Sequence, residues 1–157
     1  MTTQHTKYLI YSGHWDRDKK LDYGRLTLNC LEKGNLKIWK ATTSTASRQH
    51  YAKQFKRFGC IPANNNIIGR KYHILTTPED SRHVKGVEGS FYRVYPNEVI
   101  TTKGTKRTAI GIHKDANEPG SLGCIVLTPK RFISFEKAIK ELRLQGIGQL
   151  PLQVQYS

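Results

Sequence analysis

The feature that most constrains the fold of this chain is the alternation of apolar and polar residues over short segments separated by turns. Residues 24–31 and 35–40 alternate in this way on either side of a Glu-Lys-Gly-Asn turn, which predicts a hairpin with one buried face. Further strand-like segments occur at 71–75, 89–95, 108–113 and 152–156. Strands at this spacing predict a mainly β fold whose sheets form a sandwich or a barrel-like system.

One segment late in the chain has the periodicity of an amphipathic α-helix. Thr128 fits the N-cap, Pro129 the first helical residue and Gly146 the stop signal. The apolar residues that recur at helical spacing are Phe132, Phe135, Ile139 and Leu142. We therefore predict an α+β protein with one helix over residues 129–145, packed on a sheet through its phenylalanine face. The polar stretch 41–58 is predicted to be a surface loop or a short exposed helix.

Length and charge restrict the class of protein. A chain of 157 residues without repeats or linkers predicts a single domain over 1–157. Lys and Arg number 26 against 12 Asp and Glu, a formal net charge of +14 that favours an anionic partner such as a cell envelope. The basic residues gather at 53–57, 69–71 and 103–107. No helix-turn-helix, zinc finger or aromatic RNA-binding motif accompanies them, so we expect no specific recognition of nucleic acid.

Membrane, metal and disulfide classes receive no support. No apolar run approaches the roughly 20 residues of a membrane span, and the first residues do not resemble a secretory signal, so we expect synthesis in the cytoplasm. Three cysteines, without a C-x-x-C pair, are too few for a disulfide framework. Cys30 and Cys60 are expected to be small buried residues. Because no H-E-x-x-H motif is present either, we predict neither a metal nor a cofactor.

The residues that indicate a possible catalytic chemistry lie around a short loop. His113 ends a predicted strand and Cys124 comes eleven residues later, so the imidazole and the thiol can approach each other. An imidazole can accept the proton of a thiol, and the resulting thiolate is a nucleophile for acyl transfer. Gly123 permits a tight turn that leaves backbone N–H groups directed at a developing oxyanion. The pair alone favours a core histidine and a buried, inert cysteine over a catalytic pair.

The surrounding residues extend this pair into a longer pattern. His113 followed by Ser121-Leu122-Gly123-Cys124-Ile125 resembles the signature of the L,D-transpeptidase (YkuD) catalytic-domain family, in which a histidine precedes Ser/Thr-x-Gly-Cys and apolar residues. The upstream segment from Gly59-Cys60-Ile61-Pro62 to Gly69-Arg70-Lys71-Tyr72-His73-Ile74 is similar to the family's Pro-x-Gly-x-Tyr/Phe-x-Ile stretch, with looser spacing. The short gap from histidine to cysteine resembles a compact subgroup that includes secreted antibacterial effectors.

The resemblance implies a YkuD-like catalytic domain that acts on peptidoglycan stem peptides. Cys124 would attack the carbonyl between a diamino acid at position three and D-Ala at position four, forming a thioester. His113 would be the base for Cys124 and then the acid for the leaving amine. An amine acceptor would make the protein an L,D-transpeptidase, and water would make it an L,D-carboxypeptidase.

The resemblance also assigns supporting roles around these two residues. Ser121 would hydrogen-bond within the loop, Gly123 would contribute to the oxyanion site, and Tyr72 and Leu122 would contact the substrate. In the family the imidazole is commonly oriented by a backbone carbonyl, and Asp115 is the alternative orienting group in this chain. Val126 stands where many members have the arginine usually credited with binding a substrate carboxylate, and Leu122 where many have His or Arg. That carboxylate contact must therefore come from elsewhere or be absent.

The charge and the motif together indicate a biological context. We expect a monomer that acts at the cell wall or periplasm after specialised export or cell lysis, as an antibacterial effector or a phage lysis enzyme. The alternative is a non-catalytic, basic β-rich module that binds nucleic acid or an anionic cell-wall polymer, with Cys124 buried and inert. Fast alkylation of Cys124 at a depressed pKa would indicate the enzyme, and reaction only on unfolding would indicate the module.

Overall fold

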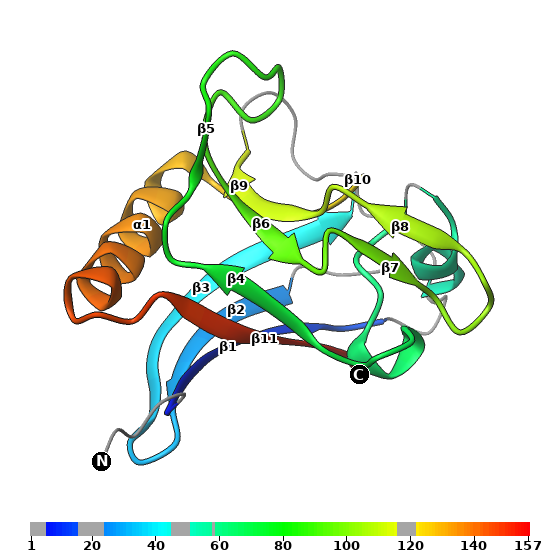
Figure 1. The fold of residues 1–157 in the computed structure, drawn as a ribbon, viewed down its shortest axis with the longest axis horizontal. Helices are drawn as coiled ribbons and strands as arrows, with labels where there is room; N and C mark the ends of the chain where they lie inside the picture. The colour runs from blue at the N-terminus through cyan, green and yellow to red at the C-terminus, as the bar shows by residue number, and fades with distance from the viewer. Residues whose placement is uncertain (1–5, 16–23, 45–50, 58, 116–121) are drawn as a thin grey trace.

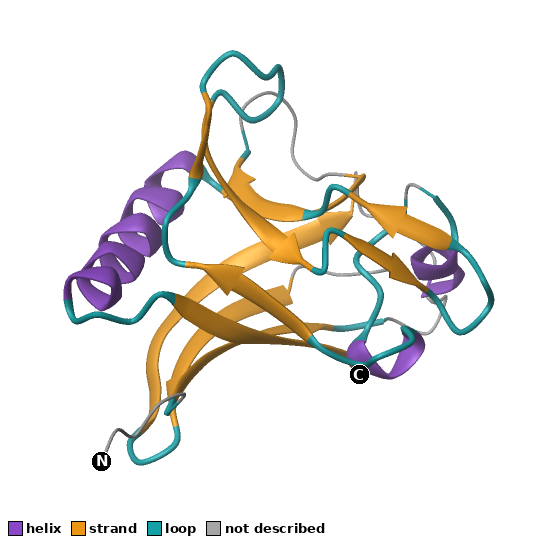
Figure 2. Ribbon diagram, in the orientation of Figure 1, coloured by secondary structure: helices purple, strands orange, loops and turns teal. Residues whose placement is uncertain are grey.

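The computed structural model describes residues 6–15, 24–44, 51–57, 59–115 and 122–157, and these are mainly β with one long α-helix (Figures 1 and 2). The elements are β1 (Lys7–Gly13), β2 (Gly24–Cys30), β3 (Gly34–Ser44), β4 (Tyr72–Leu75), β5 (Glu79–Ser81), β6 (Gly89–Tyr95), β7 (Glu98–Ile100), β8 (Lys106–Thr108), β9 (Gly111–Lys114), β10 (Leu122–Leu127), α1 (Pro129–Leu144) and β11 (Gln149–Tyr156). Two short 3-10 helices span Tyr51–Phe55 and Asn64–Asn66.

The principal sheet is closed on itself. Its nine strands have the order β4-β11-β1-β2-β3-β10-β9-β6-β5, and β4 also pairs with β6, so all of these strands except β5 form a ring. Strands β7 and β8 form a separate two-stranded ribbon. A mainly β, barrel-like fold with one helix packed on a sheet was predicted from the sequence, and the structure confirms it (Figure 1).

The period-two pattern explains where the core lies. In β11 the residues Leu150, Leu152 and Val154 are buried while the residues between them are exposed. The buried residues of the other strands join them in one apolar cluster. Because burying a large apolar side chain contributes about 1.5–3 kcal/mol, this alternation fixes which face of each strand turns inward.

Helix α1 covers part of this cluster and packs against β3, β9 and β10. It begins at Pro129 after Thr128 and ends at Leu144, one residue before the predicted end. Phe135 is fully buried, and its ring meets the rings of Trp39 and Tyr92 edge-on at 5.3 and 5.4 Å. Aromatic pairs prefer this arrangement over face-to-face contact. The phenylalanine face of the helix is therefore the packed face, as predicted.

Two sequence expectations differ from the structure. The strand expected over 108–113 is interrupted at Ala109, where φ is +58°, so β8 ends at Thr108 and β9 begins at Gly111. The stretch 41–58 is not wholly at the surface, because Thr43 and Gln54 are buried. Their polar groups are satisfied internally: the Thr43 hydroxyl donates to Gly123 O, and Gln54 Oε1 accepts from the backbone N–H of Ala63. Composition alone does not reveal such internal partners.

Within the described ranges, no helix combines the length and the apolar character needed to cross a lipid bilayer.

Candidate functional site

His113 and Cys124 lie on neighbouring parallel strands. Val126 of β10 is beside His113 of β9, and Cys124 lies two residues before Val126 in the same strand. The alternate residues Ile112 and Ile125 are fully buried in the apolar cluster. Cys124 and His113 do not belong to that cluster; the thiol is partly exposed, and His113 is buried with 7% of its surface accessible.

The backbone orients the His113 imidazole. Nδ1 lies 2.7 Å from the carbonyl oxygen of Lys114, and because a carbonyl can only accept, Nδ1 is the protonated nitrogen. The neutral ring therefore presents an unprotonated Nε2. Burial lowers the pKa of His113, and the Lys114 hydrogen bond opposes this shift. The ring is thus a neutral acceptor at neutral pH, and the group that orients it is a backbone carbonyl, as the resemblance implied. Asp115, the alternative orienting group, has its backbone N–H bonded to Leu127 O.

Cys124 is partly exposed, in contrast to buried Cys30 and Cys60. Burial of its sulfur raises its pKa, while a backbone hydrogen bond from Gly111 and the nearby charges of Arg107 and Arg93 act in the opposite direction. The resting thiol is therefore protonated, which differs from the depressed pKa that we expected of a catalytic cysteine. A thiol in this state becomes nucleophilic only when a base removes its proton during attack.

A break in the sheet register surrounds Cys124. Leu122 pairs with Ser44 and Val126 with Thr42, so residues 123–125 of β10 face a single residue of β3. Such a bulge takes backbone groups out of the regular ladder and re-aims side chains, and bulges are frequent beside active sites. Gly123 has φ +121°, and a Cβ there would approach Arg107 Nη2 to 2.7 Å. Glycine is therefore required at this position by both conformation and space.

Arg107 supports the segment behind Gly123. Its fully buried guanidinium donates to three carbonyl oxygens: Nη1 bonds Gln54 O and Cys60 O at 2.8 and 3.0 Å, and Nη2 bonds Gly59 O at 2.6 Å. The expectation that Arg107 belongs to a cluster of surface charges was wrong. In β8 Arg107 is the buried residue between exposed Lys106 and Thr108, and the three polar residues of this strand give no sequence signal for that burial.

A second arginine, Arg93, is close enough to Cys124 for their charges to interact. Arg93 of β6 pairs with Gly111 of β9, and its guanidinium lies 5.2 Å from the centre of the Phe91 ring. The Phe91 ring in turn lies 5.9 Å from the His113 ring and occupies the space that a Cβ of Gly111 would need. Sequence reasoning missed Arg93 and Phe91, because pairing across β6 and β9 is not readable from local patterns.

The other predicted site residues are Ser121, Leu122 and Tyr72. Ser121 lies outside the described residues, and Leu122 begins β10 with its side chain undescribed. Tyr72 is buried, and its hydroxyl donates to Pro62 O at 2.8 Å. Burial raises the Tyr72 pKa well above its usual range. This position lets Tyr72 hold the Pro62 segment in place, and it gives no support to a direct substrate contact.

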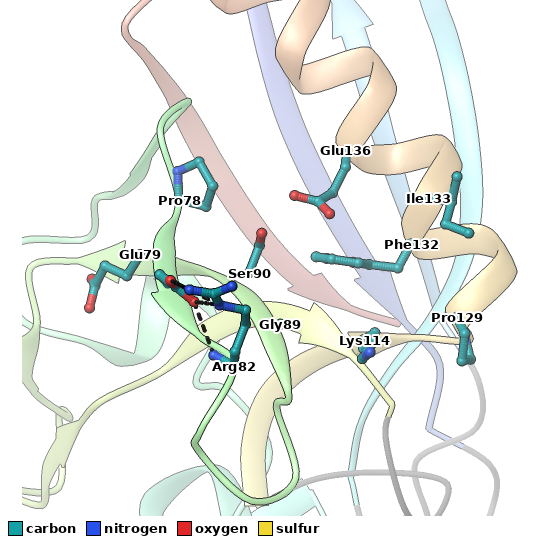
Figure 3. Close-up of a pocket in the computed structure, with 11 residues that line it drawn as sticks. Pro78, Glu79, Arg82, Gly89, Ser90, Lys114, Pro129, Phe132, Ile133 and Glu136 are labelled. Atoms are coloured by element: carbon teal, nitrogen blue, oxygen red, sulfur yellow. Dashed lines mark hydrogen bonds and ion pairs between the residues drawn. The ribbon is translucent and has the colours of Figure 1, made fainter.

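A pocket of about 510 Å³ lies beside Lys114, at the end of β9 (Figure 3). Lys114 enters it from β9, Ser90 from β6, and Phe132 and Glu136 from α1. Glu136 accepts a hydrogen bond from Tyr92 Oη at 2.8 Å. Neither His113 nor Cys124 is among the residues that line this pocket, so it is separate from the thiol.

The described residues contain no group of three or more His, Cys, Asp or Glu side chains arranged to hold a metal ion. No protein-family model and no curated protein matched the chain. A functional assignment therefore depends on the geometry around Cys124 and on the motif that contains it.

Proposed function

We propose that the protein is a cysteine acyltransferase that acts on peptidoglycan stem peptides, as an L,D-transpeptidase or an L,D-carboxypeptidase. The observation that carries this proposal is the placement of His113 and Cys124 on adjacent parallel strands, with Nδ1 of the imidazole held by Lys114 O. The resemblance of residues 113–125 to the YkuD signature supports the choice of substrate. An inert cysteine of the core would be fully buried, whereas Cys124 is partly exposed.

The proposed reaction has two acyl transfers. Nε2 of His113 accepts the Cys124 proton as Sγ attacks the peptide carbonyl, which gives a tetrahedral intermediate. Collapse of this intermediate breaks the C–N bond, and the imidazolium gives its proton to the leaving amine of D-Ala. An amine or a water molecule then attacks the thioester, again with His113 accepting its proton, and the thiol leaves with that proton. A raised thiol pKa and a lowered imidazole pKa fit deprotonation during attack better than a preformed ion pair.

The bulge in β10 is the proposed oxyanion site. Developing negative charge on the carbonyl oxygen needs N–H donors close to the attacked carbon. Residues 123–125 lie where the β3 ladder loses its register, next to the nucleophile. The backbone around Gly123 is fixed by the Thr43 hydroxyl on Gly123 O at 2.9 Å, so donors in this segment are preorganised.

Arg93 is the proposed contact for the substrate carboxylate that Val126 cannot supply. Nε and Nη2 of Arg93 donate to both oxygens of Glu79 at 2.7 and 3.0 Å, and Nη1 donates to Asn97 Oδ1 at 2.6 Å. A guanidinium has five N–H groups, so one remains on each of Nη1 and Nη2 without a partner among the described residues. Two such groups suit bidentate binding of a carboxylate.

The proposed site of action is the cell wall, reached by specialised export or after lysis, in an antibacterial effector or a phage lysis enzyme. A net charge of +14 would concentrate such an enzyme on an anionic envelope, because summed surface charge attracts polyanions over a Debye length of about 8–10 Å.

Mass spectrometry of defined muropeptides tests this proposal. The parent protein, Cys124→Ala and the control Cys30→Ala, which removes a buried thiol, are each incubated with tetrapeptide and pentapeptide muropeptides. We expect loss of D-Ala or new dimers with the parent and the control, and neither with Cys124→Ala. Products that persist in Cys124→Ala, or an inactive parent protein, would refute the proposal and leave the binding module as the better hypothesis.

A further inference from the structure

A second concave surface lies on the outside of β1, β11 and β4. It encloses about 630 Å³ and is lined by residues of these strands and of the segment 64–71. None of its lining residues belongs to β9 or β10, and three strands separate β11 from β10 in the sheet order. This groove is therefore distinct from the surface that carries Cys124, and its ligand can be inferred without reference to the proposed acyl transfer.

A row of rings crosses the floor of this groove. Pro151 of β11 pairs with His73 of β4, and His73 pairs with Tyr95 of β6. On the other side, Tyr8 precedes Leu9, which pairs with Leu152, so Tyr8 lies beside Pro151. The alternate residues of these strands are buried, and the row is therefore on the outer face.

We call the space over Pro151, between the strands that carry Tyr8 and His73, the slot. The His73 and Tyr95 rings are stacked at 5.4 Å with an interplanar angle of 19°, so the other face of the His73 ring is turned toward Pro151. The strands that carry Tyr8 and His73 are two positions apart, about 9.5 Å between their backbones. A flat ring held between two others needs about 7–8 Å at carbon contact distances of 3.5–4.0 Å. The spacing of these strands therefore leaves room for a ring-shaped ligand over Pro151, in the groove that Tyr8 and His73 both line.

Two cations flank one end of the slot. Arg70 and Lys71 both line the groove and are exposed, and neither forms an ion pair with a described carboxylate. The backbone of Arg70 is held at φ +55°, and its carbonyl accepts from Asn64 Nδ2 at 3.0 Å. Asn64 Oδ1 accepts in turn from the Val154 backbone N–H. A non-glycine residue in this conformation carries a cost of about 1–3 kcal/mol and is often found where a ligand is bound.

Two amide side chains in the groove help to decide between an acidic polysaccharide and a nucleic acid as its ligand. Asn65 and Gln153 line the groove, and each amide has both donor and acceptor atoms. The hydroxyl groups of a sugar also donate and accept, whereas phosphate oxygens only accept. Cations and amides in the same groove match a polymer that has its acid group and its hydroxyl groups on one ring, as a uronic acid does. We propose that this groove binds an acidic polysaccharide, with a sugar ring in the slot and a carboxylate at Arg70 and Lys71.

Equilibrium binding of a short oligogalacturonate tests the proposal, with a neutral maltooligosaccharide of the same length and an oligothymidylate for comparison. The variants are Arg70→Gln/Lys71→Gln and Tyr8→Ala. The control Lys137→Gln/Lys140→Gln removes the same charge from exposed residues of α1. We expect the parent to prefer the oligogalacturonate, the groove variants to weaken its binding by about tenfold or more, and the control to stay close to the parent.

Three results would overturn this proposal. The first is an oligogalacturonate that does not bind or is not preferred over the neutral oligosaccharide. The second is equal weakening by the groove and control charge variants, which would indicate attraction by net charge alone. The third is tighter binding of the oligothymidylate with the same dependence on Tyr8, Arg70 and Lys71, which would make the groove a nucleic-acid site. Because none of these variants touches His113 or Cys124, the outcome is independent of muropeptide turnover.

Discussion

Replacement of Arg107 by methionine tests whether a buried cation without a carboxylate stabilises this fold. The side chain donates three hydrogen bonds to carbonyls of residues 54–60, and methionine keeps much of the volume but none of the donors. Leaving a buried acceptor unsatisfied costs about 1–3 kcal/mol, while removal of a desolvated charge returns part of that loss. We therefore expect the free energy of unfolding to fall by about 3–5 kcal/mol, a large share of the roughly 5–15 kcal/mol typical of a domain.

Urea unfolding followed by circular dichroism measures this change, with Lys106→Met as the matched control. Lys106 is the adjacent residue, is exposed, and has an ion pair with Glu98 at 3.7 Å, so its replacement should change the free energy of unfolding by less than about 0.5 kcal/mol. An Arg107→Met protein with the urea midpoint of the parent would refute the reasoning. It would mean that the three hydrogen bonds only offset the cost of burying the guanidinium.

Three further outcomes are expected from the same structure. Phe135→Ala should lower the free energy of unfolding by about 3–5 kcal/mol in urea, because the ring is fully buried. Alkylation by iodoacetamide, located by peptide mass mapping, should label Cys124 in the folded protein, while the two buried cysteines react only in urea. Because burial raises the Cys124 pKa, the labelling rate should keep rising beyond the pH range in which ordinary thiols ionise. A plateau within that range would contradict the raised pKa. The acid limb of kcat/KM for muropeptide turnover should lie below the ordinary imidazole pKa of about 6.5, because burial lowers the His113 pKa and the base stays unprotonated to lower pH; a limb above that value would contradict it.

Local pattern was sufficient for most of the elements. The hairpin of β2 and β3, the strands β4, β6 and β11, and helix α1 all have clear periodicity or capping residues, and they lie close to their predicted positions. The interruption at Ala109 was missed because its left-handed conformation has no signature in a residue other than glycine or asparagine. The burial of Thr43 was missed because its partner Gly123 is distant in the sequence, and that of Gln54 because its partner Ala63 follows an intervening turn that composition does not reveal.

The candidate site was predictable only in part. The motif singled out Cys124 and His113, and the structure places both outside the apolar cluster, although His113 is itself buried. Arg93 lies in β6 and comes close to them only through pairing with β9, a long-range relation that one sequence does not contain. The raised pKa of Cys124 is likewise a property of the packed environment. The motif therefore predicted which residue types form the candidate site, whereas their pKa shifts and the position of Arg93 depend on the three-dimensional arrangement.

The parallel pairing of β1 with β11 has a consequence for how this protein is made. Leu9 pairs with Leu152 and Tyr11 with Val154, so a strand that leaves the ribosome early has its neighbour at the far end of the described chain. Until β11 emerges, one edge of β1 has unsatisfied backbone groups that can pair with other chains. Contacts at such separation slow folding, because the cost of loop closure precedes the gain. Completion of the ring during biosynthesis therefore waits for β11, and until then the growing chain is most exposed to aggregation and proteolysis.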